Sequence, residues 1–140
     1  MDYLHDLYTS HLERININDE STQTVLATNL CSIGGLKLSH DKKNLVYDVH
    51  IGSFIFESDL LSYNISSNSQ TNILSNYDQN IQPAYSPDDN KIIYLVISRN
   101  RPSTFKISTL SLVYTHLSIL DLGTKSINNF TNSPLTTYDS

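Results

Sequence analysis

The sequence predicts an all-β fold assembled from repeated units of four short antiparallel strands. A strand-like segment of alternating apolar and polar residues occurs at 11–17, 59–65 and 116–122, and a polar turn follows each copy. A second motif, a Ser-x-Asp turn between two strand-like segments, occurs at 38–47 and 83–94. Long stretches with apolar residues at helical spacing are hard to find, so the repeats decide the fold class.

The three strand-like segments predict β-hairpins. They read HLERINI, DLLSYNI and HLSILDL, with apolar residues at the second, fifth and seventh positions of each copy. The copies begin at His11, Asp59 and His116, which are 48 and 57 positions apart. A short apolar piece follows each turn, so every copy predicts a strand, a turn and a returning strand.

The Ser-x-Asp motif predicts a tight reversal that leads from one strand into the next. It reads LSHDKKNLVY at 38–47 and PAYSPDDNKIIY at 83–94, with the aspartates 47 positions apart. Asp and Asn side chains bond to the nearby backbone and tolerate left-handed geometry, and Pro fixes one turn dihedral. We expect the strand residues just before the two turns, Leu38 and Tyr85, to point into a core.

Together the motifs give units of about 48 residues with four strands each, a period typical of β-propeller blades. The predicted fold is therefore a partial β-propeller of four-stranded antiparallel blades occupying residues 1–140. It comprises a half blade at 3–28, a blade at 33–75, a blade at 81–131 and the start of a next blade at 132–140. The alternative is a plain antiparallel sandwich in which the motifs agree by coincidence.

The turn at 83–94 resembles the repeat of TolB-like, WD-type β-propellers, whose blades carry PAWSPDGK followed by an apolar strand. Tyr85 stands where that family has Trp, and the turn at 38–47 is a degraded copy that lacks the Pro and the Gly. The resemblance covers about residues 11–134. It implies a fold rather than an activity, because such blades occur in TolB proteins, in peptidases of the prolyl oligopeptidase and tricorn types, and in many uncharacterised proteins.

The sequence predicts no catalytic residue, no metal site and no cofactor. None of the glycines belongs to a Gly-x-Ser-x-Gly elbow, and the five histidines lack metal-ligand spacing. The pair Gly34-Gly35 lacks the Gly-Lys-Ser/Thr ending of a phosphate loop and instead indicates a β-bulge or a close approach of the backbone.

The composition restricts the class of partner that the chain can bind and does not decide its cellular compartment. Nine Lys and Arg against 14 Asp and Glu give a net charge of −5, which disfavours nucleic acid. No apolar run approaches the roughly 18 residues of a membrane span, and a single cysteine excludes an internal disulfide. The residues after Met1 do not form a secretory signal and suggest the cytoplasm, whereas the TolB resemblance implies the periplasm if a signal-bearing segment precedes them.

The predicted function is a non-enzymatic interaction module or scaffold, part of a longer propeller, that binds a protein partner or associates with itself. The candidate surface residues are Asp88, Asp89 and Asn90 in the turn, and Arg99 and Arg101 in an insertion at 98–109. One alternative is the propeller portion of a prolyl-oligopeptidase- or tricorn-type serine peptidase that lacks its catalytic domain. Another is a gene remnant without function.

Overall fold

All regular structure in the described part of the chain is β-strand, as predicted. The computed structural model describes residues 9–29, 31–51, 57–76, 78–99, 113–131 and 133–134. The strands are β1 (Thr9–Ile15), β2 (Thr22–Asn29), β3 (Cys31–Leu38), β4 (Asn44–Ile51), β5 (Ser58–Asn64), β6 (Ser69–Leu74), β7 (Gln79–Tyr85), β8 (Lys91–Arg99), β9 (Val113–Asp121), β10 (Ile127–Asn129) and β11 (Ser133–Pro134). No helix long and apolar enough to cross a membrane occurs among these residues.

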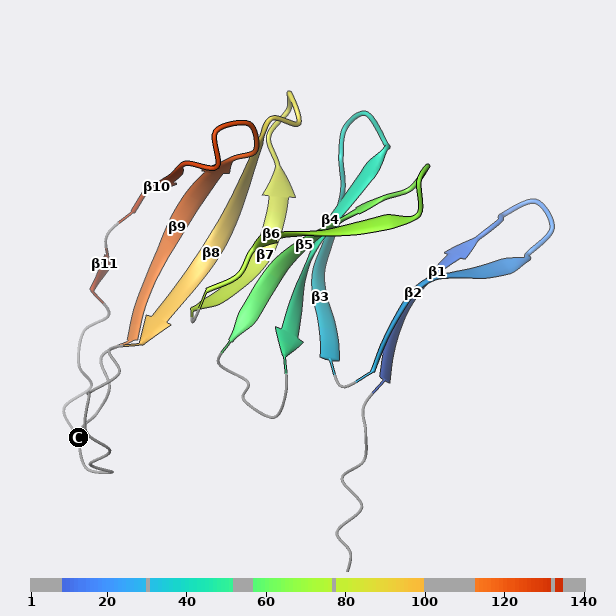
Figure 1. The fold of residues 1–140 in the computed structure, drawn as a ribbon, viewed down its shortest axis with the longest axis horizontal. Coiled ribbons are helices and arrows are strands. Elements are labelled where there is room, and N and C mark those ends of the chain that lie inside the picture. Colours follow the sequence, from blue (N-terminus) through green and yellow to red (C-terminus); the bar gives the residue numbers. More distant parts are fainter. Residues whose placement is uncertain are drawn as a thin grey trace, which may run out of the picture.

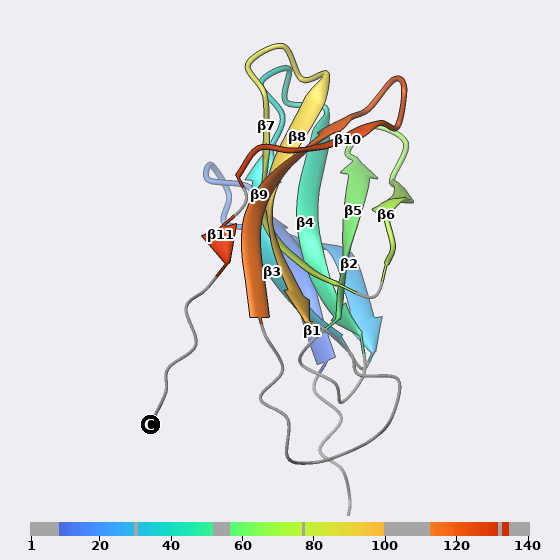
Figure 2. The same cartoon turned by 90° about the vertical axis from the view of Figure 1, so that its left-hand side faces the viewer.

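The strands form three antiparallel groups that follow one another in the chain. Strands β1 and β2 make the N-terminal hairpin, strands β3 to β6 make the first unit, and strands β7 to β10 make the second unit, where β11 also pairs with β9. The three groups lie side by side in Figure 1. The turns that join β3 to β4 and β7 to β8 emerge at the same end of the molecule (Figure 2).

The first and second units meet where β5 begins. Ser58 and Gln79 form a parallel strand pair there. The Ser58 hydroxyl donates to the Asn80 carbonyl at 2.6 Å, and the Asn80 Nδ2 donates to the Ser58 carbonyl at 3.0 Å. Both side chains are buried, so these reciprocal hydrogen bonds fix the position at which the second unit starts.

The main core lies between the first and second units. Its fully or almost fully buried members come from strands of both units: Val46, Leu60, Ile92, Tyr94, Val96 and Leu120. Side chains alternate between the two faces of a strand, so one face of each unit supplies this cluster. Burying one such side chain contributes roughly 1.5–3 kcal/mol, which makes this interface the main source of stability between the units.

A second core cluster lies on the opposite face of the first unit. It contains Tyr47, Val49, Leu61 and Tyr63. Tyr63 lines a pocket together with Leu12 of the hairpin, so this face is turned toward the hairpin. The first unit therefore buries apolar residues on both faces.

The backbone repeats where the sequence motifs repeat. Left-handed φ values of 50° to 62° occur at three sets of positions that the repeat makes equivalent: Gly35 and Gln82; Lys42 and Asp89; Glu20, Asn68 and Lys125. The first set lies at a β-bulge in the first strand of each unit, the second in the Ser-x-Asp turns, and the third in the hairpin turns. The units thus share a backbone plan even where their side chains differ.

Predictions about single positions have different outcomes. The predicted bulge at Gly34-Gly35 is confirmed by the register shift between β3 and β4. Tyr85 packs against the main core as expected. The prediction that Leu38 points into a core is wrong, because this residue is 47% exposed.

Candidate functional site

Each Ser-x-Asp turn is closed by its own side chains. In the second unit the Ser86 hydroxyl donates to Asp88 Oδ1 at 2.6 Å, and in the first unit the Ser39 hydroxyl donates to Asp41 Oδ1 at 2.7 Å. The hydrogen bond from Ser86, helped by those from Asn90, lowers the pKa of Asp88 to about 2. Asp88 and Asn90 are exposed, but their polar groups are largely used inside the turn.

Asp89 connects the turns of the two units. Its Oδ1 accepts hydrogen bonds from His40 N at 2.8 Å and lies 3.0 Å from His40 Nδ1, while its Oδ2 accepts from Asp41 N at 2.9 Å. Desolvation raises the pKa of Asp89, but these hydrogen bonds outweigh it and leave the pKa below its ordinary value. The structure thus gives this predicted surface residue an internal role between the units.

The two predicted basic residues are not brought into a described site. Arg99 is the last residue of β8, and its side chain lies outside the described residues, as does the whole of Arg101. The insertion at 98–109 is described only at residues 98 and 99. These candidates remain predictions.

A buried carboxylate that sequence reasoning missed joins the two units near their first strands. Asp48 in β4 is 2% exposed, and its Oδ1 accepts a hydrogen bond from Gln82 N at 3.0 Å. His50 Nε2 lies 3.5 Å from its Oδ2. A Cβ placed on Gly35 would overlap Asp48 Oδ1, and one placed on Gly34 would lie 2.5 Å from Oδ2. The glycine bulge therefore makes room for this side chain.

Burial sets the acidity of Asp48. Desolvation raises its pKa above 3.8, although the Gln82 N–H and the neighbouring His50 act in the opposite direction. One sequence signal could have indicated this residue: Asp48 is the single acidic residue in the otherwise apolar strand segment 45–49.

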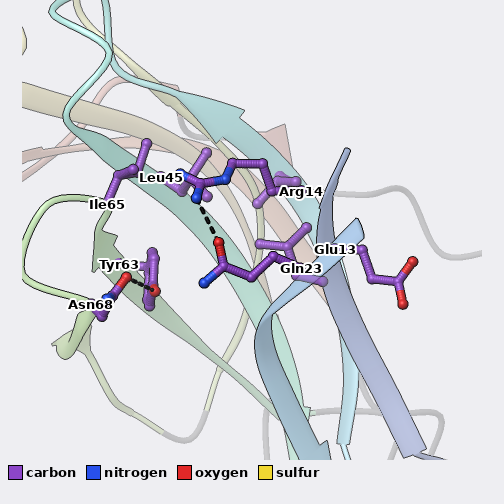
Figure 3. A pocket seen from close by; sticks show the side chains of 9 residues that line it. Glu13, Arg14, Gln23, Leu45, Tyr63, Ile65 and Asn68 are labelled. Atoms are coloured by element: carbon purple, nitrogen blue, oxygen red, sulfur yellow. Dashed lines mark hydrogen bonds between the residues drawn. The ribbon is translucent and has the colours of Figure 1, made fainter. Parts of the chain in front are cut away.

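A pocket of about 220 Å³ lies between the hairpin and the first unit (Figure 3). Arg14 and Gln23 enter it from the hairpin, where Arg14 Nη2 donates to Gln23 Oε1 at 2.5 Å. The wall on the side of the first unit is largely apolar and includes Leu36, Leu45, Tyr63 and Ile65. Its residues come from distant parts of the chain, which is why no local motif predicted it.

The second unit has an apolar face on the side away from the first unit. This open face consists of Ile93, Leu95, Leu117 and Ile119, which pair across β8 and β9. Ile93 is 37% exposed, whereas its repeat counterpart Val46 is fully buried. Leu117 is half-buried, whereas its counterpart Leu60 is fully buried. The positions of Val46 and Leu60, which belong to the core in the first unit, are thus less covered in the described part of the second.

The hairpin also presents apolar residues to solvent. Ile15 is 60% exposed and Ile17 is 90% exposed. Their repeat counterparts, Tyr63 and Ile65, lie on the face of the first unit that is turned toward the hairpin. The equivalent face of the hairpin is therefore its outer face. Within the described ranges, no three His, Cys, Asp or Glu side chains gather as metal ligands would.

Comparisons with known proteins support the fold. No family model and no curated protein matches the sequence. The structure is similar to the crystal structure of TolB from Acinetobacter baumannii, with a TM-score of 0.65 and 20% identity over 91% of this chain and 28% of that one. It is also similar to an acylaminoacyl peptidase solved in complex with Z-Gly-Gly-Phe-chloromethyl ketone, with a TM-score of 0.55 and 10% identity over 93% of this chain and 24% of that one. The chain thus has a TolB-like fold and spans about a quarter of the length of these proteins.

Proposed function

We propose that this chain is a segment of a TolB-like β-propeller that acts as a non-enzymatic interaction module, and that the open face of its second unit receives another blade. The observation that carries the proposal is the contrast between Ile93 and its fully buried counterpart Val46. An apolar sheet face of this kind is stabilised when a second apolar face covers it. In the first unit, the equivalent face is covered by the strands of the second unit.

The occupant that we propose is the hairpin of a second copy of the chain. Inside the chain, each group turns an apolar face toward the group before it, and the outer face of the hairpin, with Ile15 and Ile17, has no such neighbour in the described structure. Contact between this outer face and the open face of another copy would continue the order in which the hairpin, the first unit and the second unit pack against one another. Such head-to-tail contact is heterologous, so copies would add successively until a ring closes.

Solution mass after gel filtration, measured by light scattering over a range of concentrations, tests this proposal. We expect the wild-type chain to associate, and both Ile93→Lys and Ile17→Lys to reduce the association because each places a charge in the proposed contact. Lys43→Ala is the matched control, since Lys43 is exposed and lies in a turn outside both faces.

The outcomes of this experiment distinguish the possible occupants of the open face. Loss of association in both Ile variants supports head-to-tail contact between copies. Loss in Ile93→Lys alone keeps the open face as the docking surface but shows that the hairpin is not its partner. A wild-type chain that is monomeric and cooperatively folded at all concentrations would overturn self-association and would show that the open face does not need a cover.

The similarity to an acylaminoacyl peptidase favours a second candidate function, the propeller portion of a serine peptidase of the prolyl oligopeptidase type. In that case the partner would be a catalytic domain. Sequencing the gene region tests it directly: an in-frame serine hydrolase domain downstream would support this function, and further blades behind a signal peptide would support the TolB-like scaffold.

A further inference from the structure

The pocket between the hairpin and the first unit differs from the same place in the next interface. Leu45 in the pocket wall is half-buried, whereas its counterpart Ile92, between the first and second units, is fully buried. Tyr63 and its counterpart Leu120 are both buried. The molecule therefore fills this position at one interface and leaves it hollow at the other.

Two side-chain exchanges explain the difference. Ser62 is the repeat counterpart of Arg14, and its hydroxyl lies 3.4 Å from the Tyr85 hydroxyl, so a tyrosine from the second unit occupies that site. The counterpart of Tyr85 is Leu38, which is 47% exposed. Leu38 does not line the pocket, so the site that Tyr85 occupies at the second interface has no equivalent side chain here, and Arg14 in place of a serine brings a guanidinium to its edge.

The polar groups of the pocket are mostly hydrogen-bond donors. Gln23 Oε1 accepts from Arg14, and Asn68 Oδ1 accepts from the Tyr63 hydroxyl at 2.9 Å, so the acceptor oxygens of both amides are occupied (Figure 3). The amide nitrogens of Gln23 and Asn68 have no hydrogen-bond partner among the described residues, and most N–H groups of Arg14 are also free there. Arg14, Gln23 and Asn68 are exposed, so these N–H donors, which include a positive charge, are available to a ligand in the pocket.

The one carboxylate in the lining does not neutralise this charge. Glu13 Oε1 lies 3.5 Å from His11 Nε2, and its side chain turns away from the pocket in Figure 3. Within the described ranges, no acidic side chain lies within ion-pair distance of Arg14. A planar guanidinium suits a carboxylate, which can accept two of its N–H groups at once.

The apolar wall of the pocket determines the chemistry of the part of the ligand next to the carboxylate. Leu36, Leu45 and Ile65 offer no hydrogen-bonding side-chain group, so the ligand needs an apolar body next to its carboxylate. A volume of about 220 Å³ is below the roughly 300–1,000 Å³ of pockets for drug-sized ligands. One large apolar residue with a free carboxyl group is of the right size.

We propose that this pocket binds an apolar residue that carries a free carboxylate, with Arg14 holding the carboxylate and the leucine and isoleucine wall holding the side chain. The C-terminus of a peptide and a free acylated amino acid both offer this chemistry. The pocket is separate from the open face of the second unit, so the proposal stands or fails independently of the proposed function.

Calorimetric titration of the full chain tests the proposal with three probes: a hexapeptide that ends in Leu, the same peptide with an amidated C-terminus, and N-acetyl-leucine. We expect the free carboxylate to bind at least about tenfold more tightly than the amide, because the charge-assisted hydrogen bonds to Arg14 are lost on amidation. Tighter binding of the hexapeptide than of N-acetyl-leucine would indicate a peptide terminus as the ligand, whereas equal binding would indicate a small acid.

Variants that copy residues of the filled interface into the hollow one separate recognition from folding. Arg14→Ser should weaken binding of the free acid about tenfold and leave binding of the amide unchanged, and Leu38→Tyr should weaken both by filling the volume. Lys37→Ser is the control, because it removes an exposed positive charge that does not line the pocket. Thermal melting of each variant shows whether it folds. Equal affinity for acid and amide, an equal loss in Lys37→Ser, or no saturable binding to the folded wild-type chain would overturn the proposal.

Discussion

The first and second units have the same backbone and different interiors. At the bulge, Gly35 and Gln82 have the same φ of 53°, yet one is glycine and the other is not. In the middle of the second strand, the buried carboxylate Asp48 in the first unit has Leu95 as its counterpart in the second. The turns and bulges of the two units thus share a backbone conformation. The side chains at equivalent positions differ with the element that each unit packs against.

Substitutions at the bulge should show the largest difference between the units. Gly35→Ala should lower the free energy of unfolding by about 3 kcal/mol, because the new Cβ overlaps Asp48 and crowds Pro83 at a left-handed φ. Gln82→Ala keeps the same backbone strain and removes only an exposed side chain, so we expect a change within about 0.5 kcal/mol. Urea unfolding of the two variants measures both values. Similar losses would mean that backbone geometry, and not the carboxylate, demands glycine at position 35.

The bulge also shows how far sequence reasoning reaches. Gly34-Gly35 predicted a bulge, and the regular offsets between motifs predicted the repeated strands and turns, because these features depend on residues close together in the chain. Gln82 gave no sign of the equivalent bulge, since glutamine has no preference for a left-handed φ. Its amide is held by Asp48, 34 positions earlier, and such a contact cannot be read from local pattern.

Leu38 and the pocket illustrate the same limit. The repeat correctly placed Tyr85 against a core, but applying the same rule to Leu38 failed because the element that covers a position belongs to the neighbouring group. The pocket has walls from the hairpin and from the first unit. Its charge and shape depend on how these parts pack, which the sequence pattern does not specify.

Two buried tyrosines provide a smaller test of the same comparison. Tyr94 lies opposite Ser118; burial raises the pKa of Tyr94, and the Ser118 side chain acts in the opposite direction. The equivalent Tyr47 lies opposite Leu61, and its buried hydroxyl has no hydrogen-bond partner among the described residues. Burial, with a contribution from Tyr63, raises the pKa of Tyr47 to about 12.

We therefore expect Tyr94→Phe to destabilise the chain by about 1 kcal/mol, and Tyr47→Phe to be neutral or stabilising by up to about 1 kcal/mol. Equilibrium urea unfolding at neutral pH decides between these signs. A loss of stability in Tyr47→Phe as large as that in Tyr94→Phe would show that the Tyr47 hydroxyl has a partner.

The buried carboxylate should appear in the pH dependence of stability. Because burial raises the pKa of Asp48 in the folded chain, this group binds its proton more tightly when folded than when unfolded. Its contribution to stability is therefore greatest at or below its unfolded pKa near 3.8 and declines as the pH rises through the folded pKa.

Asp48→Asn should remove this decline and keep the acceptor for Gln82 N. Thermal midpoints from pH 3 to pH 8 measure the effect as the difference between variant and wild type, which should increase with pH and then level off. Asp41→Asn is a control of opposite sign, since hydrogen bonds led by that from Ser39 lower the pKa of Asp41. A constant difference between Asp48→Asn and wild type would show that position 48 does not titrate in this range.

The smallest effect should come from the link between the two turns. Asp89 and Lys42 occupy equivalent positions with φ of 57° and 62°, but only Asp89 reaches the other unit. Substituting Ala at both positions imposes the same backbone strain, so the difference between Asp89→Ala and Lys42→Ala isolates the bonds to His40 and Asp41. We expect a lower thermal midpoint for Asp89→Ala at pH 7.

We expect acid to abolish the difference in thermal midpoint between Asp89→Ala and Lys42→Ala. The depressed pKa of Asp89 means that its contribution is present above the unfolded pKa near 3.8 and is lost as the pH falls through the lower folded pKa. The two Ala variants should therefore converge in strong acid. If they melt together at pH 7 as well, the turns are held by the core between the units, and the carboxylate only follows an arrangement that Val46, Leu60 and their partners already impose.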